Sequence, residues 1–304
     1  MKKIAILTNY TKDPDHSITR QIADYIGSRG GDAWIPDFRG GLGYDSNKLA
    51  EDDAKFMVKD LTDLPEDTEC AITLGGDGTL LQAARMLLGK KVPLFGINLG
   101  NLGFLTSASR ENMTEGLDAL LDDAYIVDER TMLHGKVLER VDEEEDSEKQ
   151  IVMESTALND IVVARSGFSR LVDLKIYVND NLMNIYGADG LIISTATGST
   201  GYNLSAGGPI VMPQADVMIV TPICPHSLQA RSIVVPGTDR IRVSISKRHK
   251  TQEEEAVCTF DGQIGQKLGI YGETEICKAQ ETARILRIRG MNPYQILQKK
   301  INSF

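Results

Sequence analysis

The hydrophobic positions of the first 125 residues alternate between two patterns. Short continuous apolar runs, which are typical of buried strands, alternate with segments whose apolar residues recur every three or four positions, as on one face of a helix. This alternation indicates an α/β domain with a mostly parallel sheet. The expected strands lie at residues 3–8, 69–74 and 92–97, and the expected helices at residues 16–28, 46–60, 79–88 and 111–121.

The pattern changes near Ala124. From there to about residue 288, short β-like runs are separated by turn residues, which is typical of a β-rich domain with two packed sheets. We therefore expect an α/β domain at residues 1–125, a β-rich domain at 126–288 and a C-terminal segment at 289–304. The expected strands of the second domain lie at residues 131–140, 155–163, 171–178, 233–235, 240–246, 256–260 and 283–288, and a terminal helix is expected at 293–300.

Length, charge and cysteine content narrow the class of protein. A chain of 304 residues exceeds what one hydrophobic core usually serves, and a hydrophobic fraction of 41% supplies ample core material. The net charge of −10 argues against a nucleic-acid binder with a broad basic surface. No apolar stretch approaches the ~20 residues that span a bilayer, so no membrane partner is expected. The four cysteines form no CxxC pair, which favours a reducing cytoplasm over a disulfide or zinc framework.

Residues 74–81, LGGDGTLL, place a charged residue in a glycine turn at the end of an expected strand. The stretch is not a P-loop, which needs GxxxxGK followed by Ser or Thr, and it lacks the third glycine of the GxGxxG fingerprint. Amides at the start of the following helix favour anions such as phosphate, and open α/β sheets bind ligands at the carboxyl ends of their strands. Asp77 therefore either caps the helix or faces a ligand, and the stretch alone leaves both interpretations open.

Residues 187–209, GADGLIISTATGSTGYNLSAGGP, combine glycines with many hydroxyl side chains. This composition suits a loop that wraps a polar ligand, because backbone amides and hydroxyls supply hydrogen bonds without bulk. A run of tight turns in a β domain is the alternative interpretation. The segment around Ser205 lacks the first glycine of the GxSxG hydrolase motif, so a serine hydrolase is not predicted.

Asn159 and Asp160 interrupt the strand-like run at residues 155–163. An amide beside a carboxylate can bind a ribose diol or an exocyclic amine. The same pair is also common in turns and bulges, and on its own it allows both interpretations.

In this order and spacing, the three stretches together resemble the NAD kinase family. The GGDGT piece alone is shared with lipid kinases and phosphofructokinases, so the glycine- and threonine-rich block with the Asn-Asp pair carries the resemblance. Ala196 departs from the family pattern, in which proline is usual, and Arg231-Ser232 stands where Arg-Pro is frequent. The matching pieces are Gly75-Gly76-Asp77-Gly78-Thr79, Asn159-Asp160, Asp189-Gly190 and Thr197-Gly198-Ser199-Thr200-Gly201-Tyr202, with further familial stretches at residues 100–105, 221–228 and 260–263.

The resemblance implies an enzyme that phosphorylates the 2′-hydroxyl of the adenosine ribose of NAD with ATP, giving NADP. Asp77 would be the base that faces this hydroxyl, and Phe104 would lie against the adenine. The implied phosphate-binding residues are Gly75, Gly76, Gly78 and Thr79. The implied NAD-binding residues are Asp77, Gly78, Phe104, Asn159, Asp160, Arg170, Gly187, Asp189, Thr200, Gly201, Tyr202, Asn203, Leu204, Ser205 and Gln263.

The resemblance also implies the surroundings of the reaction. Mg²⁺ would enter with ATP, the C-terminal helix would pack back on the N-terminal domain, and the chain would form a homodimer or homotetramer in the cytoplasm. Two other functions stay open: a lipid kinase that shares the GGDGT motif, and a non-catalytic dinucleotide sensor in which Asp77 only caps its helix. A dehydrogenase is disfavoured because the GxGxxG run is absent.

Overall fold

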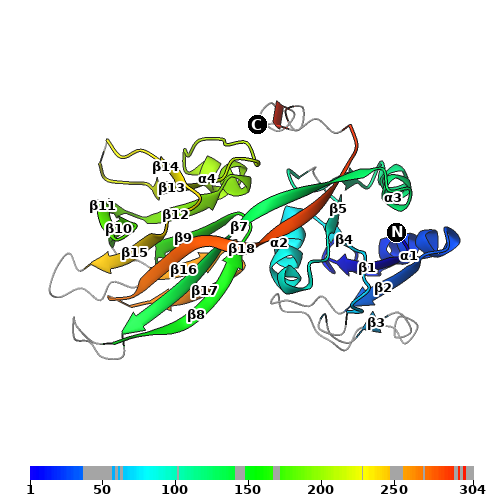
Figure 1. Ribbon diagram of the computed structural model, residues 1–304, viewed down its shortest axis with the longest axis horizontal. Coiled ribbons are helices and arrows are strands. Elements are labelled where there is room, and N and C mark those ends of the chain that lie inside the picture. Colours follow the sequence, from blue (N-terminus) through cyan, green and yellow to red (C-terminus); the bar gives the residue numbers. More distant parts are fainter. Residues whose placement is uncertain are drawn as a thin grey trace. The chain divides into compact units, whose positions relative to one another are not determined.

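The structure, a computed structural model, divides into two compact units, and Figure 1 traces the chain through both. The first unit comprises Met1–Glu129 and Ala283–Phe304, and the second comprises Arg130–Thr282. The expected boundaries, after residues 125 and 288, lie a few residues from these limits. The structure describes residues 1–36, 57–58, 61, 64–100, 103–140, 148–166, 172–227, 229–246, 256–269, 271–290, 294 and 297–298.

A parallel sheet forms the centre of the first unit. Strand β1 (Lys3–Thr8) pairs in parallel with β2 (Asp32–Pro36) and with β4 (Cys70–Gly75). Strand β4 pairs in parallel with β5 (Leu94–Asn98), so the carboxyl ends of β1, β4 and β5 lie at one end of the sheet. The prediction of an α/β domain with a mostly parallel sheet is confirmed. The other strands are β3 (Met57–Val58) beside β2, β6 (Ala108–Ser109) beside β5, and the end of β18 (Glu273–Ile288), which also pairs with β5.

The helices of the first unit contribute apolar stripes to its core. Ile18, Ile22 and Ile26 recur every four residues, and this stripe is buried in the same cluster as Ile4 and Ile6 of β1. None of the helices in the described part of the chain has the length and apolar character needed to cross a membrane. The helices are α1 (Ser17–Ser28), α2 (Asp77–Met86) and α3 (Met113–Leu121).

The structure differs in several details from the elements expected in the first unit. Helix α2 begins at Asp77 rather than at residue 79, because Gly76 already takes the extended N-cap conformation directly after β4. Strand β2 is not predicted, because its short, partly exposed sequence DAWIP has no clear apolar period and forms a strand by pairing with β1. Most of the helix expected at 46–60 and most of the one expected at 293–300 lie outside the described residues. Where the first of these ranges is described, at Met57–Val58, the chain forms strand β3 and not a helix, because it pairs there with β2.

Two sheets form the second unit. Their strands are β7 (Tyr125–Arg140), which enters from the first unit, β8 (Lys149–Ala157), β9 (Asp160–Arg165), β10 (Val172–Val178), β11 (Asn181–Ala188), β12 (Gly190–Thr195), β13 (Val217–Ile223), β14 (Ile233–Pro236), β15 (Ile241–Ser246), β16 (Ala256–Phe260), β17 (Ile264–Leu268) and β18. One sheet is antiparallel, in the order β14-β13-β12-β9-β16-β17. The other contains the antiparallel pairs β10–β11, β10–β15, β15–β18 and β7–β8.

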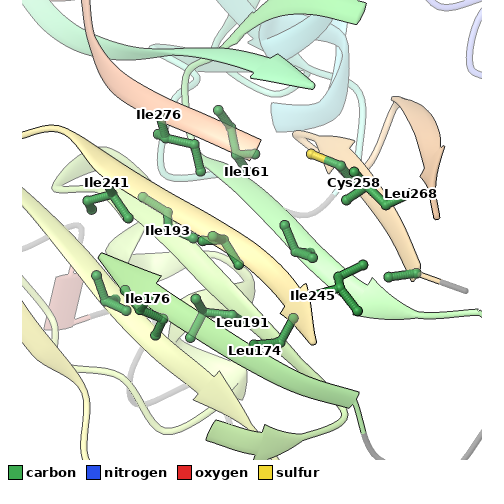
Figure 2. Close-up of a cluster of buried hydrophobic side chains, with 14 of the residues drawn as sticks. Ile161, Leu174, Ile176, Leu191, Ile193, Ile241, Ile245, Cys258, Leu268 and Ile276 are labelled. Atoms are coloured by element: carbon green, nitrogen blue, oxygen red, sulfur yellow. The ribbon is translucent and has the colours of Figure 1, made fainter. Parts of the chain in front are cut away.

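The core of the second unit contains side chains from both of these sheets. Leu174 and Ile176 of β10 join Leu191 and Ile193 of β12 in one cluster of buried side chains, which Figure 2 shows in close-up. In each pair the two residues are two positions apart, as the strand period requires for side chains on one face. The prediction of a β-rich domain with two packed sheets is confirmed.

The strand expected at 155–163 is in fact two strands. Strand β8 ends at Ala157 and β9 begins at Asp160, so Leu158 and Asn159 form the connection between them. This break brings Asn159 and Asp160 to the start of β9, where the pocket described below lies.

Candidate functional site

Asp77 lies at the carboxyl end of β4, where the glycine turn leads into α2. Its half-buried carboxylate accepts hydrogen bonds from two backbone amides after β5: Phe104 N donates to Oδ2 at 2.8 Å and Leu105 N donates to Oδ1 at 3.1 Å. The N-cap residue of α2 is Gly76, so Asp77 does not occupy the N-cap position. The carboxylate therefore faces a neighbouring segment, which argues against the interpretation of Asp77 as a helix cap.

Two glycines allow this arrangement. A Cβ on Gly103 would stand 1.8 Å from Asp77 Oδ1, and a Cβ on Gly75 would stand 2.2 Å from Thr79 Oγ1. Any other residue at either position would displace the side chain that it faces. Thr79 is held in turn by Asn9, whose Nδ2 donates to Thr79 Oγ1 at 3.3 Å. Close approach, rather than an unusual backbone angle, is therefore the reason for glycine here.

The residues expected to bind phosphate differ in their exposure. Gly75 is buried and its carbonyl accepts a hydrogen bond from Leu99 N at 2.8 Å, whereas Gly76 is half-buried and Gly78 is exposed. A phosphate would therefore meet Gly76, Gly78 and the start of α2 more readily than Gly75. Lys12 adds positive charge at this end of the sheet. Its Nζ lies near Gly100, which follows β5, since a Cβ built on Gly100 would stand 4.0 Å from it. Sequence reasoning missed Asn9 and Lys12, since single polar residues after a strand give no local signal.

In the second unit, a pocket of about 290 Å³ brings together residues from three segments. The segments are the start of β9, the short helix α4 (Tyr202–Ser205), and the end of β16 with the turn that follows it. Three of the predicted NAD-binding residues share this pocket, and its volume is at the small end of the range for small-molecule sites. It is lined by Asn159, Asp160, Val162, Tyr202, Thr259, Asp261 and Gly262.

Asp261 holds one wall of this pocket in place. Its Oδ1 accepts hydrogen bonds from Asn159 N at 2.7 Å and Asp160 N at 3.1 Å, and its Oδ2 accepts one from Leu158 N at 2.9 Å. Positive φ angles at Asp261 (51°) and Gly262 (64°) turn the chain after β16. Asp261 is not among the predicted site residues, although it belongs to the familial stretch at 260–263. Its role depends on amides a hundred residues earlier, which no local pattern reveals.

Asp160 is the buried acid of the pocket, with 5% of its surface exposed. Burial, together with the neighbouring charge of Asp261, raises the pKa of Asp160 to about 7. The side chain therefore keeps its proton well above the pH at which an ordinary carboxyl loses it. In that form the carboxyl group can donate one hydrogen bond as well as accept others.

The glycine- and hydroxyl-rich block packs against Asn159. It forms a 3₁₀ turn at Thr197–Thr200 and then α4. A Cβ on Gly198 would stand 2.1 Å from the backbone oxygen of Asn159, and one on Gly201 would stand 3.3 Å from Asn159 Nδ2. Glycine at both positions therefore lets the block approach Asn159 closely. Tyr202 follows Gly201, lines the pocket and is 48% exposed.

Asn203 holds the same block together from within. It is fully buried, and its Nδ2 donates to the carbonyls of Ser199 and Pro209, each at 3.1 Å. Its Oδ1 accepts a hydrogen bond from Thr221 Oγ1 at 2.7 Å. The predicted residues Thr200, Gly201, Leu204 and Ser205 belong to this block, but they do not line the pocket.

The remaining predicted residues lie elsewhere or are not described. Asp189, between β11 and β12, pairs with Arg165, whose Nε lies 2.8 Å from Asp189 Oδ1. The carbonyl of Gly187 accepts a hydrogen bond from His226 N at 2.9 Å, and Gln263 is exposed in the turn after Asp261. Arg170 lies outside the described residues. Within the described ranges, no group of His, Cys, Asp and Glu is arranged to hold a metal ion.

Comparison with known proteins covers both units. A family model for the ATP-NAD kinase N-terminal domain matches residues 37–125, and one for the ATP-NAD kinase C-terminal domain matches residues 158–288. An NAD kinase from Lachnoclostridium phytofermentans is 38% identical over 300 residues, which cover 99% of each chain. An NAD kinase from Agathobacter rectalis is 37% identical over 304 residues and the whole of both chains.

Two solved structures share the fold. One is yeast NADH kinase complexed with NADH, with a TM-score of 0.80 and 22% identity, covering 100% of this chain and 88% of the other. The second is an NAD kinase from Archaeoglobus fulgidus in complex with ATP, with a TM-score of 0.70 and 24% identity, covering 99% of each chain. From the family models and the full-length relatives, the chain belongs to the NAD kinase family.

Proposed function

We propose that this protein transfers the terminal phosphoryl group of ATP to the 2′-hydroxyl of the adenosine ribose of NAD, giving ADP and NADP. Relatives named NAD kinase that match its full length support this reaction. The structural observation that carries the proposal is the orientation of Asp77, whose carboxylate is held away from its own helix by the amides of Phe104 and Leu105. A carboxylate fixed at the end of a parallel strand is well placed to meet a ligand.

Asp77 is the proposed proton acceptor. Each of its two oxygens accepts one backbone hydrogen bond, which leaves a lone pair on each for the substrate hydroxyl. A carboxylate is a far weaker base than an alkoxide, so it cannot remove the proton before the reaction begins. It orients the hydroxyl and takes the proton as the new P–O bond forms, because phosphoryl transfer depends mainly on positioning and charge stabilisation.

The proposed dinucleotide-binding residues lie in the second unit. Asn159 and Asp160 present an amide and a buried carboxyl to the pocket, and these groups can bind the ribose hydroxyls and the polar edge of the adenine. Tyr202 supplies an exposed aromatic ring on which part of the ligand can pack. Gly198 and Gly201 of the glycine- and hydroxyl-rich block pack against Asn159.

The phosphates of ATP are proposed to bind at the glycine turn of the first unit. The amides of Gly76 and Gly78 and the start of α2 supply the donors. Thr79 is buried, and its hydroxyl holds the turn through the hydrogen bond from Asn9. Mg²⁺ enters with ATP as part of that substrate and neutralises charge on its phosphates. Lys12 adds a positive charge at the same end of the sheet.

We further propose that the protein works in the cytoplasm as a homodimer or homotetramer, as the family resemblance implies. The four described cysteines are all free thiols, which agrees with a reducing compartment. Light scattering on the purified chain measures the number of copies directly, and a monomer at working concentration would contradict the oligomer.

A coupled assay tests the reaction. The purified chain is mixed with ATP, Mg²⁺ and NAD, and NADP is detected with an NADP-specific dehydrogenase. We expect NADP to form only when ATP is present. Binding of NAD without any ATP-dependent NADP would instead indicate a dinucleotide sensor, and phosphorylation of a sphingoid base or diacylglycerol in place of NAD would indicate a lipid kinase.

A further inference from the structure

Arg287, near the end of β18, makes a set of contacts that the proposed reaction does not use. The residue is 6% exposed, and it belongs to the same unit as Asp77. Its Nη2 donates to the carbonyl of Phe104 at 2.8 Å and its Nη1 donates to the carbonyl of Thr106 at 3.0 Å. Its Nε lies 3.5 Å from Oδ2 of Asp128, which supplies the opposite charge. The guanidinium therefore donates two hydrogen bonds to one short backbone segment, residues 104–106.

That same segment holds Asp77 from the other side. The carbonyl of Phe104 and the amide of Leu105 belong to one peptide group, whose oxygen accepts from Arg287 and whose N–H donates to Asp77. A peptide group is planar and its C=O and N–H point in opposite directions, so fixing the oxygen also fixes the direction of the N–H. A positive charge on the oxygen also polarises the peptide group and strengthens the hydrogen bond that its N–H donates.

We propose that Arg287 is a positioning residue for Asp77, acting through the Phe104–Leu105 peptide group. The inference rests on the proposed role of Asp77 as proton acceptor. Arg287 does not touch the substrate. It fixes the plane of one peptide group, and through that group it sets where the carboxylate stands.

A purely structural role is a poor account of these contacts. Burying a guanidinium is unfavourable unless its donors are all satisfied, and an apolar side chain of the same size would fill the space without that penalty. The segment is already tied to β18 by Ser107, whose hydroxyl donates to the carbonyl of Leu286 at 2.6 Å. The two hydrogen bonds that Arg287 donates to the carbonyls of Phe104 and Thr106 are therefore not needed to attach the segment to β18. They fix the orientation of its peptide groups.

Two substitutions and a matched control test the proposal. Arg287→Met keeps an unbranched apolar chain that reaches as far as the Nε position but removes the guanidinium donors, whereas Arg287→Lys keeps the charge but loses the fork that reaches two carbonyls. Arg289→Met is the control, because Arg289 lies just after the same strand and its Nε also donates to a backbone carbonyl, that of Tyr125 at 3.2 Å. Each variant is compared with the parent by turnover, by KM for NAD and for ATP, and by thermal unfolding.

We expect kcat to fall roughly 10- to 100-fold in Arg287→Met, since small displacements of a catalytic group have effects of this size. The KM for NAD should change little, Arg287→Lys should retain an intermediate kcat, and Arg289→Met should match the parent. In an Asp77→Asn background, Arg287→Met should lower the residual turnover no further, because the group it positions is already gone.

Hydrogen exchange supplies a readout that does not depend on activity. The amides of Phe104 and Leu105 should be protected in the parent and should exchange faster in both Arg287→Met and Asp77→Asn, because each variant loosens one side of the same segment. The control Arg289→Met should leave their exchange unchanged. If Arg287→Met does not fold, Arg287→Lys carries the same comparison.

The outcomes separate this inference from the proposed function. A parent chain that forms no NADP refutes the proposed function, and the positioning role falls with it. An active parent with an inactive Asp77→Asn variant, but with full turnover in a folded Arg287 variant, overturns the positioning role alone. The positioning role is also overturned if Arg287→Met lowers turnover by the same factor in the parent chain and in the Asp77→Asn variant, because the effect would then not depend on Asp77.

Discussion

Gly103 lies directly against Asp77: a Cβ built on Gly103 would stand 1.8 Å from Oδ1 and 2.4 Å from Cγ of the aspartate. The next two residues in the chain supply the amides that hold the carboxylate. No side chain fits between Gly103 and Asp77, so the absence of a Cβ is a condition for this contact.

Replacing Gly103 by Ala should therefore damage the reaction more than the fold. The new methyl group displaces the Asp77 carboxylate and breaks at least one of its amide hydrogen bonds, and we expect kcat to fall by ~10²-fold. The overpacked site should lower the free energy of unfolding by about 1–3 kcal/mol. Steady-state kinetics and urea unfolding measure the two effects.

Gly89→Ala is the control for the substitution itself. Gly89 is exposed and a Cβ there meets no atom within 4 Å, so both turnover and stability should stay at the parental level. Parental turnover in a folded Gly103→Ala variant would contradict the contact with Asp77 as a requirement for the reaction.

Replacing Asp77 by Asn removes the proton acceptor and keeps the size of the side chain. We expect kcat to fall by at least ~10²-fold, the low end of the effect of losing a general base. The fold and the affinity for NAD, measured by calorimetry, should persist. Stability should drop by about 1 kcal/mol, because the Asn side chain accepts one of the two backbone hydrogen bonds and turns its own NH₂ toward the other donor.

Asp24→Asn is the control for Asp77→Asn, because it makes the same chemical change at a different position. Asp24 is an exposed carboxylate of α1, and its loss should leave turnover unchanged. Near-parental NADP formation by the Asp77→Asn protein would remove Asp77 from the mechanism.

The place of Asp77 between a strand and a helix could be predicted from sequence, because it depends only on neighbouring residues. An apolar run, a glycine pair and an amphipathic segment follow one another within residues 70–86, and they form β4, the turn and α2. The groups that hold its carboxylate are not local. Phe104 and Leu105 reach it because β4 and β5 pair in parallel, and Arg287 reaches the same segment from the end of the chain. No pattern within one element encodes such a meeting.

The pocket of the second unit could also be predicted only in part from local sequence patterns. The pair Asn159 and Asp160 could be noticed as polar residues in a strand-like run, and the strand at Ala256–Phe260 could be predicted with its bounds. The contact between them could not, because Asp261 binds the amides at 158–160 only once β9 and β16 are paired. Local patterns predict elements, whereas the site depends on how distant elements pair.

Tyr202→Ala should weaken NAD binding more than it slows the chemistry. The exposed ring lines the pocket, and its removal takes away apolar contact worth about 1–2 kcal/mol, or roughly tenfold in affinity. Turnover at saturating NAD should change much less, because Tyr202 is not proposed to act on the reacting atoms. Calorimetry with NAD gives the affinity, and Tyr202→Phe separates the ring from its hydroxyl.

Leu182→Ala is the control for the loss of an exposed apolar side chain. Leu182 lies on β11 of the same unit, is 53% exposed and does not line the pocket. Its loss should leave the affinity for NAD unchanged. Equal affinity for NAD in the parent and in Tyr202→Ala would exclude the ring from the binding site.

Asp160 should make the stability of the protein depend on pH in a direction opposite to that of most carboxylates. Burial, with the nearby charge of Asp261, raises its pKa from 3.8 to about 7 in the folded chain. Between these two values the unfolded chain has lost this proton and the folded chain still holds it. The folded state therefore binds more protons, and the contribution of Asp160 to the free energy of unfolding falls as the pH rises from about 4 to about 7. Below this window the group is protonated in both states, and above it the group is ionised in both.

Asp160→Asn should remove this dependence, because the amide does not titrate. We expect the difference in free energy of unfolding between variant and parent to move in favour of the variant by a few kcal/mol across that window, and then to level off. Urea unfolding at a series of pH values measures the difference, in which the other titrating groups cancel. A flat difference for Asp160→Asn, or one that moves in favour of the parent, would mean that the folded chain does not hold this proton between about pH 4 and about pH 7.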